Sequence, residues 1–278
     1  MPFSRTQSIL KKLLPKPCFT LLYKLACWGY EYWGKISDEM YYLSSHIYYL
    51  LKRDSSNVKK IKTIYSIRPY TLVGRTALSA TYDIASEIEK NRIDGCFVEC
   101  GVYRGGCSAL MAMVANESRS GRKVWLFDSF EGLPEPAIED EPNIEKDPGP
   151  DRKGGYLHKG YCLGTYEEVS NLLFSTLSLD RENVFMVKGW FKDTIPRYKD
   201  KIGAISFLRI DADWYESTKC CLEHLYDNVI TGGYVFIDDY GLPGCKKATD
   251  EFLQKMGLDV KFTFNGPWAA HFVKPQIK

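Results

Sequence analysis

The sequence has no Cys-x-x-Cys pair and only four histidines, so it lacks the ligand spacing that structural zinc sites use. Its nine cysteines are an odd number, which argues against a framework of disulfides and for a reducing compartment. Cys96, Cys100 and Cys107 fall in or beside apolar runs, and we interpret them as small core residues. With 278 residues, 45% of them hydrophobic and 26% charged, the chain has the composition of a globular protein with a large core.

The sequence also lacks an apolar run that could span a bilayer. Lys24 and Glu31 interrupt "LLYKLACWGYEYWG", and "MYYLSSHIYYLLKR" is shorter than the roughly 20 apolar residues that a membrane helix needs. No apolar segment is followed by a small-residue cleavage site, so we expect no signal peptide. These absences predict a cytoplasmic protein.

The net charge of +2 hides a basic N-terminal part. Residues 1–62 carry eleven Lys and Arg against four Asp and Glu, and they are rich in Tyr and Trp. We therefore expect residues 1–64 to form a basic, aromatic helical extension. Such a segment suits peripheral contact with the anionic inner face of a membrane. The alternative is a helix that packs on the main domain or in a dimer.

Residues 65–278 alternate strand-like and helix-like segments, which predicts an α/β domain. This order indicates a Rossmann-like fold with a mostly parallel sheet and helices on both faces. Residues 132–165 are rich in Pro, Gly and acids, and we interpret them as a long loop or lid.

Acidic residues follow most of the expected strands. Ligand sites in sheets of this type form at the carboxyl ends of the strands. Four of the five strands end in acids, namely Glu99, Asp128, Asp211 and the adjacent pair Asp238 and Asp239. One such acid could be a helix cap, but this number indicates a site.

The turn after the first strand, "ECGVYRGG", predicts a close approach of backbone to a ligand at Gly101, Gly105 and Gly106. Its spacing is not the GxGxxG of dinucleotide folds. Asp128 suits a ribose diol, which both NAD and S-adenosylmethionine (SAM) contain. Glu99 suits the ammonium and sulfonium of SAM better than a pyrophosphate, so we favour SAM over NAD.

Asp211, Asp238 and Asp239 come from neighbouring strand ends and are expected to converge. Carboxylates this close repel each other unless one is protonated or a cation lies between them. Oxygen ligands without nearby His or Cys suit Mg²⁺ or Mn²⁺ rather than zinc. The alternative is structural, with Asp239 capping a turn and Asp211 paired with a lysine.

Seven blocks of sequence, in one order, resemble the macrocin O-methyltransferase (TylF) family over roughly residues 65–275. They are "YTLVGRTALSATYDIASEI", "GCFVECGVYRGG", "FDSFEGLPEP", "KGWFKDTIP", "RIDADWYEST", "GGYVFIDDYG" and "GCKKATDEF". One departure is Ala212, at a position where members of the family often have glycine.

The resemblance implies a class I methyltransferase fold with a seven-stranded sheet, in an oligomeric, SAM- and Mg²⁺-dependent enzyme that methylates a sugar hydroxyl. It implies no nucleic-acid partner. The implied metal ligands are Asp211, Asp238 and Asp239. The implied SAM contacts are Glu99, Gly101 and Asp128, and also Thr71, Gly105, Ser108 and Gly189.

Methyl transfer to a sugar hydroxyl needs a positioned acceptor and a base, because the hydroxyl is a very weak acid. We expect Asp211 to be the base, with His158 of the long loop as the alternative. Trp190, Phe191, Trp214 and Tyr215 flank the same edge and could stack on a sugar or simply pack. A catechol or another vicinal diol could replace the sugar, and an inactive scaffold is the non-enzymatic alternative.

Overall fold

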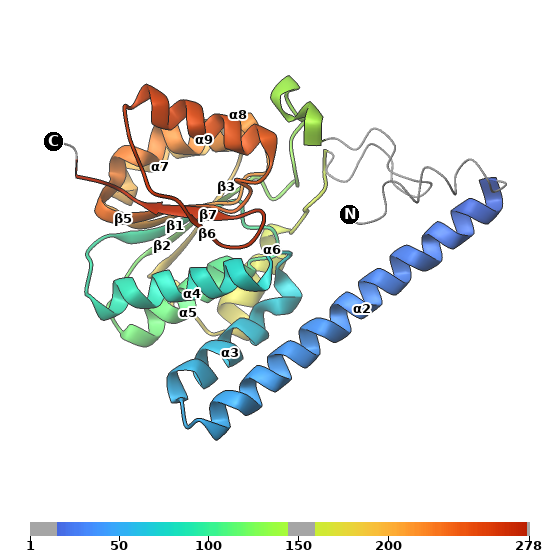
Figure 1. The fold of residues 1–278 in the computed structure, drawn as a ribbon. Coiled ribbons are helices and arrows are strands. Elements are labelled where there is room, and N and C mark those ends of the chain that lie inside the picture. Colours follow the sequence, from blue (N-terminus) through green and yellow to red (C-terminus); the bar gives the residue numbers. More distant parts are fainter. Residues whose placement is uncertain (1–15, 144–158, 277–278) are drawn as a thin grey trace. The chain divides into compact units, whose positions relative to one another are not determined.

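The computed structural model describes residues 16–143 and 159–276 of the chain (Figure 1). Two compact units are distinguished, residues 1–61 with 145–156, and residues 62–144 with 157–278. The first contains helix α2 (Lys16–Leu51) and the start of α3 (Ser55–Ile67), which continues into the second. No helix in the described ranges has the length and apolar character of a membrane span.

The second unit is built on a seven-stranded sheet in the order β3-β2-β1-β4-β5-β7-β6. The first five strands pair in parallel, and β7 and β6 are antiparallel additions at one edge. The strands are β1 (Cys96–Cys100), β2 (Val124–Asp128), β3 (Val184–Lys188), β4 (Ile205–Ile210), β5 (Val229–Ile237), β6 (Thr263–Phe264) and β7 (Ala270–Val273). The mostly parallel sheet that the sequence predicts is confirmed.

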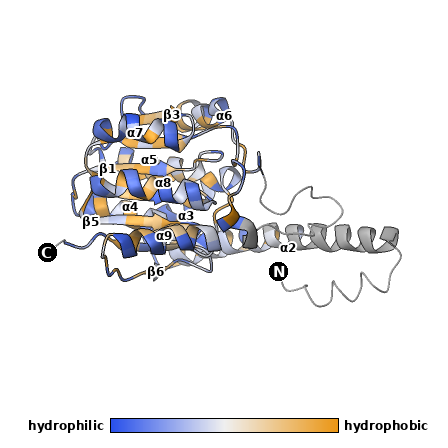
Figure 2. Cartoon of the chain, turned by 90° about the horizontal axis from the view of Figure 1, so that it is seen from above, coloured by the Kyte–Doolittle hydropathy of each residue, from blue (hydrophilic) through white to orange (hydrophobic). Residues whose placement is uncertain are grey.

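Helices cover both faces of this sheet, with α4 and α5 on one face and α7, α8 and α9 on the other (Figure 1). The helices are α4 (Arg75–Lys90), α5 (Gly106–Ser118), α6 (Tyr166–Ser170), α7 (Phe191–Ile202), α8 (Tyr215–Leu225) and α9 (Pro243–Lys255). Short helical turns are η1 (Arg68–Tyr70), η2 (Ile138–Asn143), η3 (Asn171–Thr176) and η4 (Tyr226–Asn228). In Figure 2 hydrophilic and hydrophobic colours alternate along α7, α8 and α9, as expected for helices with one face on a sheet.

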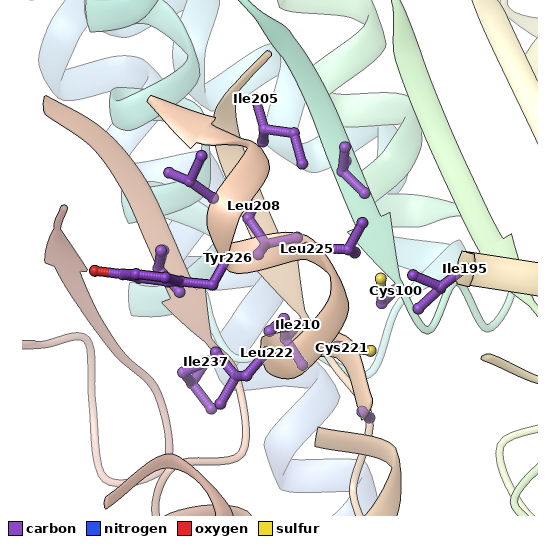
Figure 3. Close-up of a cluster of buried hydrophobic side chains, with 14 of the residues drawn as sticks. Cys100, Ile195, Ile205, Leu208, Ile210, Cys221, Leu222, Leu225, Tyr226 and Ile237 are labelled. Carbon is purple, nitrogen blue, oxygen red and sulfur yellow. The ribbon is translucent and has the colours of Figure 1, made fainter. Parts of the chain in front are cut away.

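The core between α8 and the sheet shows why the central strands read as continuous apolar runs. Every residue of β4 is buried, because helices cover the strand on both faces. Figure 3 shows Leu222 and Leu225 of α8 in one cluster with Leu208 of this strand. The interpretation of Cys96, Cys100 and Cys107 as core residues is confirmed, since all three are buried and free.

Helix α7 has no counterpart in the sequence prediction, which passes directly from the third strand to the fourth. Pro196 lies inside the helix, and proline normally ends a helix because it lacks the N–H donor and clashes with the preceding turn. Here Ile195 and Ile202 are buried on the apolar side of α7, and this packing maintains the helix despite the proline.

Candidate active site

The residues that follow the central strands lie side by side along the carboxyl edge of the sheet. Backbone N–H···O bonds of 2.8–2.9 Å continue across this edge, from Gly189 to Asp128, Gly101 to Phe127, Asp211 to Cys100, and Asp238 to Ile210. The strand ends that the sequence singles out are therefore neighbours in space, as expected of parallel strands.

The loop after β1 is held close to the end of β4. Gly101 has a φ of +89°, and a Cβ there would lie 1.6 Å from the carbonyl oxygen of Asp211, so only glycine fits. Gly105, also at φ +89°, precedes the first turn of α5 and leaves the amides of that turn facing the loop. This is the close backbone approach that the glycine pattern predicts.

Asp128 fixes the same loop through its carboxylate. One oxygen accepts the N–H groups of Val102 at 2.6 Å and Tyr103 at 3.3 Å, and the other accepts that of Phe130 at 2.6 Å. Burial raises the pKa of Asp128, and these three amides oppose the rise. A carboxylate can accept about four hydrogen bonds, so a ribose hydroxyl remains compatible with this set.

Thr71 and Gly189 border this loop from two sides. The hydroxyl of Thr71 accepts the N–H of Val73 at 3.1 Å and lies 3.8 Å from the thiol of Cys107 in the first turn of α5. Gly189 has a φ of +139°, and a Cβ there would lie 2.8 Å from Thr194 of α7. Their contact with SAM, which the resemblance implies, stays a prediction.

Arg209, the last residue but one of β4, is fully buried and binds three carboxylates. Its guanidinium donates to Glu99 at 2.7 Å, to Asp211 at 2.8 Å and to Asp238 at 2.6 Å. The sequence prediction misses this residue, although a lone arginine within the apolar strand "AISFLRI" is a signal for a buried charge that needs partners.

Glu99 and Ser108 are bonded to each other beneath the edge. The hydroxyl of Ser108 donates to the carboxylate of Glu99, whose other oxygen is bound by Arg209. Burial raises the pKa of Glu99 to about 7, against the opposing charge of Arg209. Both side chains are buried beneath the loop. Their contact with SAM stays a prediction.

Three carboxylates cluster at the ends of β4 and β5. Asp211, Asp213 and Asp239 each place an oxygen within 4.8 Å of the other two. Burial raises the pKa of Asp213, and the nearby charge of Asp211 raises it further. The pKa of Asp239 is raised by burial and then by Asp213 and Asp211. Such a group holds either protons or a cation, and these hard oxygen donors fit the expected Mg²⁺ or Mn²⁺.

The third member of this cluster differs from the expected one. Asp211 and Asp239 lie together as predicted, but one oxygen of Asp238 is bound by Arg209, and burial raises the pKa of Asp238 to about 7. Asp213 takes the third place. The strand-end rule selects the first acid after a strand, so it passes over the second aspartate of "RIDADW".

Asp213 reaches the cluster through an unusual backbone conformation. Its φ is +56°, in the left-handed region that aspartate enters more readily than most residues, and its N–H donates to Asp239 at 3.2 Å. Strained conformations of this kind are concentrated at functional sites. Asp213 is therefore the main addition that the structure makes to the candidate site.

The first part of the long loop is anchored beside this cluster. The carboxylate of Asp140 accepts the N–H of Tyr215 at 2.8 Å and so caps the start of α8. The ring of Trp214 donates to the carbonyl of Pro134 at 3.3 Å. The backbone N–H of Leu133 donates to the carbonyl of Tyr161 at 2.8 Å, and this hydrogen bond joins the two ends of the loop. His158, the alternative base, lies outside the described residues.

The aromatic residues that flank the edge have different exposures. Trp214 and Tyr215 are buried, so they pack in the core, whereas Trp190 and Phe191 are half-buried. Trp268 is 58% exposed, and the amide of Gly241, two residues after Asp239, donates to its carbonyl at 2.7 Å. Trp268 is thus an exposed aromatic side chain near the cluster, and the sequence analysis does not name it.

The chain is similar to known O-methyltransferases. The macrocin-O-methyltransferase (TylF) family matches residues 53–272. Demethyldecarbamoylnovobiocin O-methyltransferase of Streptomyces niveus is 36% identical over 192 residues, which are 68% of this chain and 70% of the relative. A tetracenomycin-C 4'-O-methyltransferase of Streptomyces olivaceus, whose name specifies a dimethoxy-rhamnosyl substrate, is 32% identical over 68% of this chain and 69% of its own.

The solved O-methyltransferase NovP aligns with a TM-score of 0.63 and 31% identity, covering 74% of this chain and 83% of NovP. The class I methyltransferase fold that the resemblance implies is confirmed. The family match covers most of the chain and includes every described residue of the candidate site. The chain therefore belongs to the macrocin-O-methyltransferase (TylF) family and is a SAM-dependent O-methyltransferase.

Proposed function

We propose that this enzyme methylates a sugar hydroxyl of a glycoside and that it needs a divalent cation. The observation that carries the proposal is the cluster of Asp211, Asp213 and Asp239 on the same edge as the glycine loop. The relative from Streptomyces olivaceus, named for a rhamnosyl substrate, supports a sugar acceptor.

The donor would lie against the loop between β1 and α5. The residues that we assign to it are Gly101, Gly105 and Asp128, with Thr71 and Gly189 at its borders and Glu99 and Ser108 beneath it. Gly101 and Gly105 allow close approach, and the first turn of α5 offers free N–H groups. Asp128 holds the loop amides in place and would accept a hydroxyl of the ribose.

The reaction is an in-line displacement. A lone pair of the acceptor oxygen forms the new O–C bond as the S–C bond breaks, and that electron pair leaves with the sulfur as a neutral thioether. The acceptor proton must go to a base. The enzyme contributes by holding the oxygen behind the methyl group and by placing the base within hydrogen-bond distance.

We assign the base to Asp213, with Asp211 as the alternative. Arg209 binds one oxygen of Asp211 at 2.8 Å, so that oxygen is already engaged and is not available to the acceptor hydroxyl. Asp213 belongs to the same carboxylate cluster, but it is not among the three carboxylates that Arg209 binds. Asp211 and Asp239 would hold the cation together with Asp213 or Asp238. When bound, the cation supplies Lewis-acid polarisation of the acceptor hydroxyls and a template for their orientation.

Trp268 would contact the acceptor. Its exposed ring lies against Gly241, where a Cβ would be 2.8 Å from a ring carbon, so the loop fixes the position of the ring. An aromatic face of this kind can pack on the apolar face of a sugar or on an aglycone. We therefore expect Trp268→Ala to raise KM for the acceptor more than it lowers kcat.

A methyl-transfer screen tests the proposed function. Purified full-length protein is incubated with SAM, Mg²⁺ and a panel of rhamnosides, other deoxysugar glycosides and catechol, and methylated products are identified by mass spectrometry. A methylated glycoside, formed with Mg²⁺ and lost with EDTA, is the expected result. Turnover of catechol alone would contradict the sugar acceptor, and turnover unchanged by EDTA would contradict the cation.

The proposal also places the enzyme in the cytoplasm. The seven cysteines from Cys96 to Cys245 are free, and five of them are buried, which suits a reducing compartment. Cell fractionation tests this location, and recovery from an oxidising compartment would contradict it.

A further inference from the structure

Helix α2 lies outside the part of the chain that matches the family, which begins at residue 53. It has 36 residues, so it is about 54 Å long. A helix of this length before a methyltransferase domain has no role in the proposed chemistry, and its surface must be explained separately.

Large apolar side chains recur along α2 with alternating steps of three and four residues. They are Trp33, Ile36, Met40, Leu43, Ile47 and Leu50, and we call this set the α2 seam. In the sequence, the same steps continue back through Gly29, which interrupts the apolar pattern, to Ala26, Leu22 and Phe19. This is the heptad spacing of a and d positions in coiled coils, in which each side chain packs between side chains of a partner helix.

The α2 seam is exposed to solvent. Apart from Ile36, which is half-buried, its members are between 48% and 70% exposed. A different side of the same helix is covered, since Tyr42 is buried and Tyr49 is half-buried. A contiguous exposed apolar surface of this kind normally marks an interface.

The charges of α2 favour a second copy of the chain over an anionic membrane. Its three lysines are balanced by Glu31, Asp38 and Glu39, so the helix has no net charge. The basic surplus of residues 1–62 therefore lies before and after the helix. Membrane-surface helices instead combine an apolar side with a Lys- and Arg-rich polar side.

The positions beside the α2 seam also permit self-association. The e positions are Ser37, Ser44 and Leu51 and the g positions are Tyr32, Glu39 and His46, which bring no pair of like charges together in a parallel, in-register pair. In the last heptad, Ile47 at a and Leu50 at d form the combination that favours two strands, whereas Trp33 and Met40 occupy the other a positions. We propose that α2 pairs with α2 of a second copy through the α2 seam, and that this contact makes the enzyme a dimer.

Two variants of the full-length protein with equal charge test this proposal. Leu43→Glu/Ile47→Glu places two charges in the α2 seam. Tyr41→Glu/Tyr48→Glu adds the same charges on adjacent positions of the same turns, at residues that are 42% and 55% exposed. Circular dichroism and methyl transfer by each variant show whether helix and catalytic domain remain folded.

Light scattering coupled to size exclusion then gives the molar mass over a range of protein concentrations. We expect the dimer mass for the wild type and for Tyr41→Glu/Tyr48→Glu, and the monomer mass for Leu43→Glu/Ile47→Glu. A monomeric wild type, a seam variant that stays dimeric, or equal loss in both variants overturns the proposal. Flotation of a monomeric wild type with phosphatidylglycerol vesicles, lost in the seam variant, would assign the α2 seam to a membrane instead.

Discussion

Arg209 determines how the charges at the carboxyl edge of the sheet are arranged. It is fully buried and donates hydrogen bonds to Glu99, Asp211 and Asp238, which come from three adjacent strands. Because a buried guanidinium cannot lose its charge, the three carboxylates are fixed in position around it. Arg209 therefore acts as a positioning residue for Asp211, which belongs to the candidate cation cluster.

Replacing Arg209→Met should lower the free energy of unfolding by about 3–5 kcal/mol, because it leaves buried carboxylates without their partner. Urea denaturation measures this loss. Lys255→Met, which removes an exposed pair with Glu223, is the matched control and should cost about 0.5 kcal/mol or less. A loss below about 1 kcal/mol for Arg209→Met would show that the buried pairs contribute little.

Asp213→Asn should reduce kcat by roughly 10²–10⁴-fold, the usual contribution of a general base, while SAM binding changes little. Asparagine tolerates the left-handed backbone at this position, so the fold should be retained. Steady-state kinetics and calorimetry with SAM separate the two effects. Asp200→Asn, on the exposed surface of α7, is the control. Near-normal kcat in Asp213→Asn together with lost turnover in Asp211→Asn would assign the base to Asp211.

Among the residues of the candidate site, the sequence predicts best the location of those that follow strand ends. Gly101, Asp128, Asp211 and Asp239 are fixed by where β1, β2, β4 and β5 stop. Arg209 could not be assigned its partners from the sequence, because they lie on neighbouring strands and burial decides which acids it meets. Asp213 depends on a turn of the backbone that no periodicity reveals.

Among the elements, η2 shows how the long loop is attached to the catalytic domain. Asp140 is buried and caps α8, and a Cβ at Gly244 in α9 would lie 1.9 Å from its carboxylate oxygen. The interpretation of residues 132–165 as a long loop or lid does not anticipate this docked turn at its start. Its contact is to helices that are distant in sequence, so local patterns do not disclose it.

Asp140→Ala should lower the free energy of unfolding by about 1 kcal/mol, the typical cost of a lost helix cap. It should also raise KM for the acceptor, because residues 134–139 lose their attachment next to the cluster. Asp140→Asn retains an acceptor for the amide of Tyr215 and should preserve both values. If Asp140→Ala and Asp140→Asn have the same free energy of unfolding and the same KM, the hydrogen bond to Tyr215 does not position the loop.

Helix α7 and the α2 seam are two cases in which the sequence pattern alone does not determine how a helix packs. Pro196 suggests a break, yet packing against the sheet maintains α7. The heptad spacing of the α2 seam is present in the sequence, but its significance depends on the exposure of those side chains in the folded chain. In both cases the deciding information is which surface the helix buries.

At the scale of the whole molecule, folding brings Asp211, Asp213 and Asp239 together from two strand ends far apart in the chain. Burial and mutual repulsion raise the pKa of Asp213 and Asp239 above their unfolded values. The cation-free folded state therefore binds more protons than the unfolded chain. By linkage, its stability must fall as pH rises from the unfolded pKa, near 4, through the folded pKa.

A bound cation replaces these protons, so its stabilising effect should grow with pH. We expect Mg²⁺ to raise Tm more at pH 8 than at pH 5.5, because protons compete for the same oxygens at the lower pH. Differential scanning fluorimetry with Mg²⁺ or EDTA at each pH measures the difference. Asp239→Asn removes one charged ligand and should abolish most of the increment, whereas Asp200→Asn should retain it. An increment that is equal at both pH values, or that survives in Asp239→Asn, would mean that Mg²⁺ binds elsewhere, and that bound protons alone relieve the repulsion in the carboxylate cluster.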